Sequence, residues 1–239
     1  MLLSLTNVSK SYGAVKVTDD FSLNLAKGEA LGVIGPNGAG KTTLFNLITG
    51  NVRPESGTVV FSGRDITGLD AAARCRSGIG RSYQIPHPFA GMTVYENVLV
   101  GATFGAGHNE KKGSAVAIKA LRKTGLLSKA NRLAGSLPLL DRKRLELARA
   151  LATEPTLLLL DEIAGGLTEH EVRELIDCIQ EIRSEGISLI WIEHIVHALL
   201  AVVDRIAVIN FGRLLVDGEP AKVMASAEVR AVYMGVEAA

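Results

Sequence analysis

The sequence predicts an α/β fold with a mostly parallel sheet, and three observations support this prediction. Short apolar runs at 31–34, 157–160 and 188–192 are typical of strands buried on both faces. A glycine-rich loop joins the first run directly to a helical segment that begins near residue 44. Between the other two runs lies a helical stripe, made of Val172, Leu175, Ile176, Ile179 and Ile182. Strands and helices that alternate in this order favour a parallel core.

The N-terminal residues predict antiparallel strands added to this core. Residues 2–8 and 21–25 alternate between apolar and polar side chains, and turn residues separate them. Residues 57–61 form another such segment, followed by the turn residues 62–65. We therefore expect a small antiparallel β subdomain that continues after the glycine-rich loop.

The middle of the chain predicts a helical subdomain. Residues 89–150 have helical patterning, with a flexible, glycine-rich interruption expected at 101–113. Thr168 and Glu171 form a capping box that opens the next helix, and residues 205–216 read as a hairpin. The 239 residues are thus expected to form a single domain, in which 1–88 and 151–239 make the core and 89–150 the helical part.

A phosphate-binding loop is the clearest chemical signal. The spacing of Gly35, Gly40, Lys41 and Thr42 fits G-x-x-x-x-G-K-[ST], in which backbone N–H groups cradle phosphates, the lysine reaches the terminal ones and the hydroxyl holds Mg²⁺. The alternative is a glycine-rich turn with an exposed lysine. The motif predicts a P-loop NTPase (RecA-like) core that binds a nucleoside triphosphate and Mg²⁺ through Gly35, Pro36, Asn37, Gly38, Ala39, Gly40, Lys41, Thr42 and Thr43.

Polar residues follow two later strands, where ligands gather in open α/β sheets. Asp161 and Glu162 come after the strand at 157–160; Asp161 is placed to support Mg²⁺, and Glu162 to polarise an attacking water. The alternative is an acidic pair that starts a solvated loop. His194 follows the strand at 188–192, and it would reach the terminal phosphate if that strand lies beside the one at 157–160. The remaining histidines are expected to be structural or solvated: His87, His108, His170 and His197.

Composition excludes several classes of protein. The formal net charge is +1 with mixed signs, which does not favour nucleic acid as a partner. The two cysteines, Cys75 and Cys178, lie far apart without metal-ligand spacing, which favours a disulfide-free fold in a reducing compartment. Charged residues interrupt the richest apolar region at 187–211, so it is not expected to span a membrane, and no signal peptide is expected.

These motifs, in this order, resemble the ATPase subunits of ATP-binding-cassette (ABC) transporters over essentially the whole chain. The resemblance implies that Tyr12 stacks on adenine, and that Gln84 contacts Mg²⁺ and water at the joint between core and helical subdomain. It also implies catalytic roles for Lys41, Gln84, Glu162 and His194, and Mg²⁺ contacts from Thr42, Gln84 and Asp161. An aromatic ring that packs on the sheet remains the alternative for Tyr12.

Several stretches resemble the branched-chain amino acid (Liv-type) uptake group within this family. They are 85–89, 92–97, 144–152, 192–194, and the C-terminal segments 218–221 and 232–235. The same lineage serves urea, amides and lipopolysaccharide export, so the cargo stays open. A soluble ABC ATPase of translation or DNA repair would carry tandem cassettes or a coiled-coil insertion, and a kinase would leave Gln84 and His194 without roles.

One segment departs from the family pattern. The signature Leu-Ser-Gly-Gly-Gln would fall at Leu137–Asp141, where only the leucine matches. The serine hydroxyl is lost, and Asp141 would add an unfavourable charge if it faced phosphate. Ile163 and Thr168 are smaller departures in the dimer-facing loop. We therefore expect a weakened ATP site at this surface, which favours a heterodimer with a second ATPase. The alternatives are a homodimer that tolerates the odd signature and a mainly regulatory subunit.

The resemblance also implies partners and a location. ATP would close a head-to-tail dimer with a second ABC ATPase, and hydrolysis would reopen it. The joint at 84–89 would receive a coupling helix from transmembrane permease subunits, which a solute-binding protein supplies with cargo. The chain would then act at the cytoplasmic face of the inner membrane as a peripheral subunit.

Overall fold

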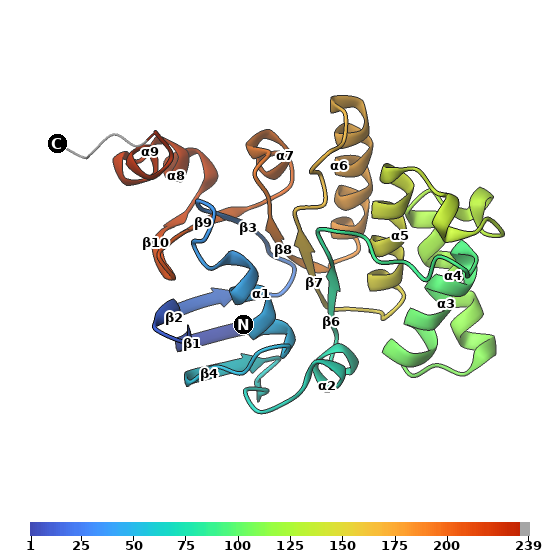
Figure 1. The fold of residues 1–239 in the computed structure, drawn as a ribbon, viewed down its shortest axis with the longest axis horizontal. Coiled ribbons are helices and arrows are strands. Elements are labelled where there is room, and N and C mark those ends of the chain that lie inside the picture. Colours follow the sequence, from blue (N-terminus) through green and yellow to red (C-terminus); the bar gives the residue numbers. More distant parts are fainter. Residues whose placement is uncertain (235–239) are drawn as a thin grey trace. The chain divides into compact units, whose positions relative to one another are not determined.

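A computed structural model describes residues 1–234, and it confirms the α/β fold class (Figure 1). The chain forms two compact units, one of Met1–Ala71 with the chain from Ile190 onward, and one of Ala72–Leu189. The boundaries of the expected helical subdomain, 89–150, differ from those of either unit, so this subdomain stays a prediction. Gly235, the last residue of the C-terminal resemblance to the Liv-type group, lies outside the described residues.

The first unit contains the expected antiparallel sheet. Its strands follow the order β2-β1-β4-β5 and comprise β1 (Leu3–Tyr12), β2 (Val15–Leu25), β4 (Ser56–Phe61) and β5 (Arg64–Asp65). Leu3 lies opposite Leu25 on one side and Phe61 on the other, and all three side chains are buried. This cross-strand packing of apolar side chains fixes the register. Both N-terminal strands are longer than the alternation predicts, since bulges shift their pairing and interrupt the apolar–polar alternation from which their length was predicted.

The first unit also contains a mostly parallel set of strands. The order is β10-β9-β3-β8, formed by β3 (Ala30–Ile34), β8 (Ser188–Ile192), β9 (Arg205–Asn210) and β10 (Arg213–Gly218). Strands β3 and β9 are parallel, and β10 returns antiparallel to β9 as the predicted hairpin. Every residue of β3 and β8 is buried, which explains their continuous apolar runs. The helices of this unit are α1 (Lys41–Thr49), α7 (Val196–Leu200), α8 (Pro220–Ala225) and α9 (Ala227–Met234).

A two-residue turn joins β9 to β10, and it carries backbone strain. Phe211 has φ 45° and Gly212 has φ 75°, as a type I′ hairpin turn requires. The Gly212 N–H donates to the Ala39 carbonyl at 2.9 Å, and a Cβ at Gly212 would lie 2.4 Å from the Val17 carbonyl oxygen. Glycine is therefore required at 212. Phe211 adopts a left-handed conformation that is costly for a bulky side chain, while its ring is 83% exposed.

We expect Phe211→Asn to raise the free energy of unfolding by roughly 1 kcal/mol, because asparagine tolerates the left-handed conformation. Urea denaturation measures the change through the transition midpoint. The control is Phe104→Asn, which removes another exposed ring at a helical position and is expected to give no gain. Equal midpoints for the two variants would contradict the strain at Phe211.

The second unit contains the remaining strands and most of the helices. Strand β6 (Ile79–Ser82) is parallel to β7 (Leu157–Asp161), and the Ser188 N–H near the end of this unit donates to the Thr156 carbonyl. The helical elements are α2 (Ala71–Arg76), α3 (Val94–Val100), η1 (Gly101–Gly105), α4 (Glu110–Lys123), η2 (Leu127–Lys129), η3 (Ala134–Ser136), α5 (Leu139–Leu151) and α6 (Glu169–Ser184). Among the described residues, no helix is long and apolar enough to cross a membrane.

The expected interruption of the helices at 101–113 is confined to residues 106–109, which form no helix. Residues 101–105 form the π-helix η1, and Gly113 lies inside α4. A Cβ at Gly101 would lie 2.6 Å from the Arg149 carbonyl oxygen, and one at Gly113 would lie 3.2 Å from a Thr103 methyl group. These glycines allow helices to approach closely; they do not loosen the chain.

Candidate functional site

The phosphate loop has the expected context of strand, loop and helix. Strand β3 ends at Ile34, α1 begins at Lys41, and Gly40 is the N-cap with φ 104°. The Lys41 side chain is buried, and its ammonium group donates to the carbonyls of Gly35 (2.8 Å) and Pro36 (2.9 Å). This arrangement contradicts the alternative of a turn with an exposed lysine. The loop is curled around a buried positive charge at a helix N-terminus, which is a favourable environment for an anion.

Glycine is required at two positions of the loop by close backbone contacts. A Cβ at Gly35 would lie 2.2 Å from the Ile209 carbonyl oxygen, and one at Gly40 would lie 2.5 Å from that of Val17. The loop is thus pressed against β9 and β2. Of the other predicted contacts, Asn37, Gly38 and Thr42 are exposed, and Pro36 is half-buried; Ala39 and Thr43 are buried.

Tyr12 stands at the end of β1, in the same unit as the loop. Its ring is 48% exposed, with the Lys10 ammonium group 5.6 Å from the ring centroid. About half of the Tyr12 ring is therefore open to solvent, and its stacking on adenine stays a prediction.

His194 follows β8, and its neighbour Glu193 has a role that the sequence did not reveal. The Glu193 side chain is buried, and its Oε2 atom accepts the backbone N–H groups of His194 (3.0 Å) and Ile195 (3.4 Å). His194 itself is exposed. The buried carboxylate therefore orders the backbone that presents the imidazole, and an acidic residue directly after an all-buried strand was the available signal.

In the second unit, Asp161 ends β7 and pairs with Arg81 of β6. An Arg81 guanidinium nitrogen donates to the Asp161 carboxylate at 2.6 Å, and both side chains are buried. Separating the two groups would leave each charge buried and uncompensated, at a cost of roughly 3–5 kcal/mol, so the bond holds both side chains in place. Arg81 lies three residues before Gln84, and no motif in the sequence indicates this pairing with Asp161.

Two predicted site residues meet at Glu162. The Gln84 Nε2 atom donates to the Glu162 carboxylate at 2.5 Å. The Glu162 backbone is left-handed, with φ 45°, and the Lys143 ammonium group donates to its carbonyl at 3.2 Å. Such backbone strain clusters at functional sites. Glu162 is therefore a positioned side chain, which contradicts the alternative of a solvated loop, and Lys143 is a further residue that sequence reasoning missed.

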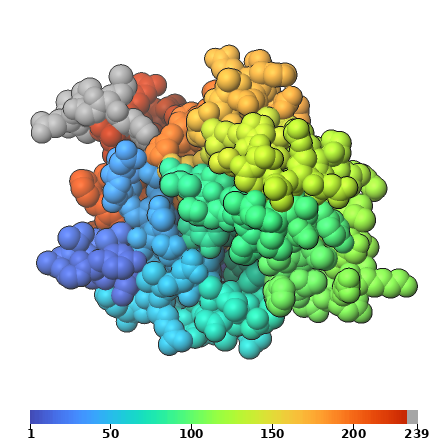
Figure 2. All heavy atoms as spheres, turned by 45° about the vertical axis from the view of Figure 1, so that its right-hand side comes forward, coloured from blue at the N-terminus to red at the C-terminus, as the bar shows by residue number. Residues whose placement is uncertain are grey.

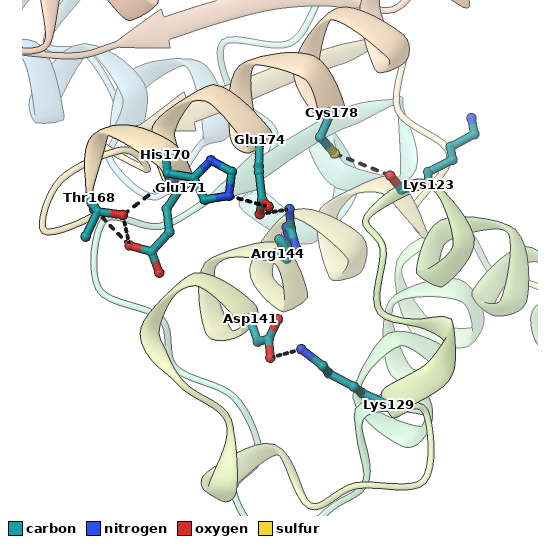
Figure 3. Close-up of polar contacts among 9 residues, drawn as sticks. All are labelled: Lys123, Lys129, Asp141, Arg144, Thr168, His170, Glu171, Glu174 and Cys178. Atoms are coloured by element: carbon teal, nitrogen blue, oxygen red, sulfur yellow. Dashed lines mark hydrogen bonds and ion pairs between the residues drawn. The ribbon is translucent and has the colours of Figure 1, made fainter.

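The segment at the family signature differs from expectation in one respect. Asp141 lies in the first turn of α5, buried, and its carboxylate accepts from the Lys129 ammonium group at 2.5 Å (Figure 3). The expected unfavourable charge toward phosphate is therefore compensated: Asp141 points to Lys129 and suits the positive end of the helix dipole. Pro138 is the N-cap without a side-chain hydrogen bond, so the lost serine hydroxyl has no substitute there.

The departure at Thr168 has a structural reason. Thr168 is the N-cap of α6, where its hydroxyl accepts the Glu171 N–H at 3.3 Å and its own N–H donates to the Glu171 carboxylate at 2.8 Å (Figure 3). The hydrogen bond from that backbone N–H lowers the pKa of Glu171. Arg144 of α5 pairs with Glu174 of α6 at 2.8 Å, which links the two helices. The predicted capping box is confirmed.

The proposed magnesium ligands are of suitable chemistry. Thr42 offers a hydroxyl, Asp161 a carboxylate and Gln84 an amide oxygen, and Mg²⁺ prefers oxygen donors with one or two carboxylates plus substrate phosphates. Among residues 1–234, no cluster of three or more His, Cys, Asp or Glu side chains could hold a metal alone. Each of these three side chains by itself therefore has the chemistry of a ligand for an ion that arrives with a nucleotide.

Comparisons with known proteins identify the family. The ABC transporter family model matches residues 18–165. The chain is 35% identical to the high-affinity branched-chain amino acid transport ATP-binding protein LivG of Salmonella typhimurium, over 98% of both chains. It is 36% identical to a probable ABC transporter ATP-binding protein of Azorhizobium caulinodans (98% of this chain, 83% of that one) and 33% identical to the lipopolysaccharide export system ATP-binding protein LptB of Haemophilus influenzae (98% and 97%).

Solved structures agree with the sequence comparisons. A nucleotide-free ATP-binding cassette of an ABC transporter superposes with a TM-score of 0.89 at 30% identity, covering 98% of this chain and 99% of that one. A cassette in its ADP conformation gives a TM-score of 0.88 at 30% identity, with the same coverage. With the phosphate loop and the Gln84–Glu162 pair in place, the chain belongs to the ABC transporter family and is an ATP-hydrolysing, ATP-binding subunit.

Proposed function

We propose that this ATPase drives uptake of branched-chain amino acids or related small polar solutes across a membrane. The observation that carries the cargo assignment is the 35% identity to LivG over 98% of both chains. LptB is 33% identical over a similar span, so lipopolysaccharide export is the second candidate, and urea or amides are others of the same lineage.

The proposed mechanism assigns a step to each positioned residue. Lys41 and the amides of the loop hold the phosphates, and Tyr12 stacks on adenine. Thr42, Asp161 and Gln84 would hold Mg²⁺, which neutralises phosphate charge when bound. Glu162 accepts a proton from the attacking water as the water oxygen bonds to the γ-phosphorus and the bond to the β–γ bridging oxygen breaks. His194 contacts the γ-phosphate, and Gln84 holds Glu162 in place for this transfer.

The proposed partners follow from the altered segment at Leu137–Asp141. A signature without its hydroxyl is a poor surface for the γ-phosphate of a facing subunit. We therefore assign the chain to a heterodimer in which a second ABC ATPase completes the site with its own signature. Transmembrane permease subunits would dock at the exposed residues of 84–89, with a solute-binding protein upstream, at the cytoplasmic face of the inner membrane. A mainly regulatory role beside an active paralogue is the alternative.

The isolated chain is expected to hydrolyse ATP about 10²-fold more slowly than its complex with the ABC ATPase encoded beside it, since one missing transition-state donor costs roughly that factor. Phosphate release by the chain alone, by the neighbour alone and by their mixture measures this. Robust turnover by the chain alone would contradict the heterodimer. Uptake of radiolabelled leucine by vesicles containing the co-purified membrane subunits tests the cargo, and uptake of another solute instead would overturn it.

A further inference from the structure

The segment Ile85-Pro86-His87-Pro88-Phe89 is held on both sides by side chains of the second unit. Pro86 and Pro88 have a fixed φ and no backbone N–H. After Ile85, the only backbone N–H groups in the segment are therefore those of His87 and Phe89. Side chains on α5 bind both backbone groups of His87, and a side chain on α3 binds both backbone groups of Phe89. A stiff segment anchored in this way moves with the helices that hold it.

The contacts from α5 form a closed set of three hydrogen bonds. The Glu146 Oε1 atom accepts the His87 N–H at 3.0 Å and the Arg149 guanidinium at 2.9 Å, while Arg149 donates to the His87 carbonyl at 2.9 Å. The Arg149 guanidinium also lies 5.0 Å from the centroid of the Phe89 ring. The Glu146 side chain is 6% exposed, so the two charge-assisted bonds that its carboxylate accepts are largely shielded from water.

The contacts from α3 complete the anchoring. Asn97 is fully buried; its side-chain oxygen accepts the Phe89 N–H at 2.8 Å and its amide nitrogen donates to the Phe89 carbonyl at 3.1 Å. Helices α3 and α5 contact each other, and Figure 2 shows the green and yellow-green residues of this part of the unit as one continuous surface. The segment, α3 and α5 therefore form one packed body.

We propose that Glu146 and Arg149 are positioning residues that make the 84–89 segment and α5 move together. We call Glu146, Arg149 and their bonds to His87 the clamp. Two hydrogen bonds connect the parts that the clamp joins to Glu162: Gln84, just before the segment, donates to the Glu162 carboxylate, and Lys143 of α5 donates to the Glu162 carbonyl. The exposed side chains of Ile85 and Phe89 lie between these anchors. A permease subunit that binds these two side chains and displaces them would move α5 and the Gln84–Glu162 hydrogen bond together. This functional half rests on the proposed transport role, whereas the mechanical half does not.

Hydrogen exchange tests the mechanical half in the isolated chain. Glu146→Leu removes the acceptor at similar volume and is expected to speed exchange of the His87 amide about tenfold or more, as expected for loss of a bond to a charged acceptor. Glu146→Gln keeps an acceptor and is expected to restore slow exchange. Glu181→Leu, at an exposed position of α6, is the control. Unchanged His87 exchange in a folded Glu146→Leu protein would overturn the clamp.

Nucleotide response tests the joint movement. In the wild type, adding ATP with Mg²⁺ is expected to change amide hydrogen exchange both in residues 84–89 and in the first turns of α5. In Glu146→Leu, only one of these two regions is expected to respond. Joint changes in that variant would overturn the proposal. Arg149→Met gives the same comparison if Glu146→Leu does not fold.

A separate arm distinguishes failure of the clamp from failure of the proposed function. In the complex with co-purified membrane subunits, Glu146→Leu is expected to leave the KM for ATP unchanged and to lower solute transported per ATP hydrolysed, with rescue by Glu146→Gln. Unchanged transport per ATP in that variant would overturn the functional half. Absence of any transport by the wild-type complex would instead contradict the proposed function, and the exchange results would stand independently.

Discussion

Replacing Glu162 by glutamine is expected to lower ATP turnover by about 10²–10⁴-fold, the usual contribution of a general base. An amide cannot accept the proton of the attacking water, yet its oxygen can still accept the hydrogen bond from Gln84 Nε2. The Lys143 contact to the backbone carbonyl is also unaffected. The geometry is therefore retained while the chemistry is lost, and ATP affinity is expected to remain within about twofold because the bonds holding the residue persist.

Phosphate release and equilibrium nucleotide binding, measured on the same preparations of the heterodimer, check this prediction. The matched control is Glu169→Gln, which makes the same change at an exposed first-turn position of α6 and is expected to have no effect. Unaffected turnover in Glu162→Gln would show that Glu162 is not the base. It would then favour the regulatory alternative.

Replacing Lys41 by alanine is expected to lower ATP affinity by roughly 10–100-fold, the range for loss of a hydrogen bond to a charged group. The Lys41 ammonium group is buried and donates to the carbonyls of Gly35 and Pro36, so its loss also leaves these two loop carbonyls without a charged donor. Both effects act on the same loop. ATPase activity is expected to fall at least in proportion to the affinity.

Titration calorimetry with ATP and Mg²⁺ measures the affinity change. Lys27→Ala removes the same charge from an exposed turn of the same unit and serves as the control. A urea denaturation curve for each variant shows whether the loss is local to the loop. Full affinity and full activity in Lys41→Ala would refute the assignment of this loop.

The fold was largely predictable from local sequence signals. The five-residue buried strands read as continuous apolar runs, and the capping box at Thr168 marked the start of α6. Gly101, Gly105 and Gly113 made the predicted interruption too long, because a glycine that permits close packing and one that permits a loop look alike until the neighbouring chain is known.

The site was predictable in its motifs but not in its supporting contacts. Gln84 and Glu162 were found separately, and their bond joins residues 78 positions apart. Arg81, Lys143 and Glu193 act by holding other groups, and such roles depend on tertiary pairing that no spacing rule reveals. Asp141 shows the reverse case: its charge was visible in the sequence, but its partner Lys129 was not.

The π-helix η1 limits how natural versions of this chain can diverge. Gly101 and Gly105 both touch the C-terminal part of α5 and the residues just after it: a methyl group at 101 would meet the Arg149 carbonyl at 2.6 Å, and one at 105 would meet the Thr153 methyl at 2.5 Å. Even alanine at either place would wedge η1 away from the helix that bears Arg149. Two positions with no chemistry of their own are thus among the least replaceable in the second unit, and evolutionary drift there is restrained by shape alone.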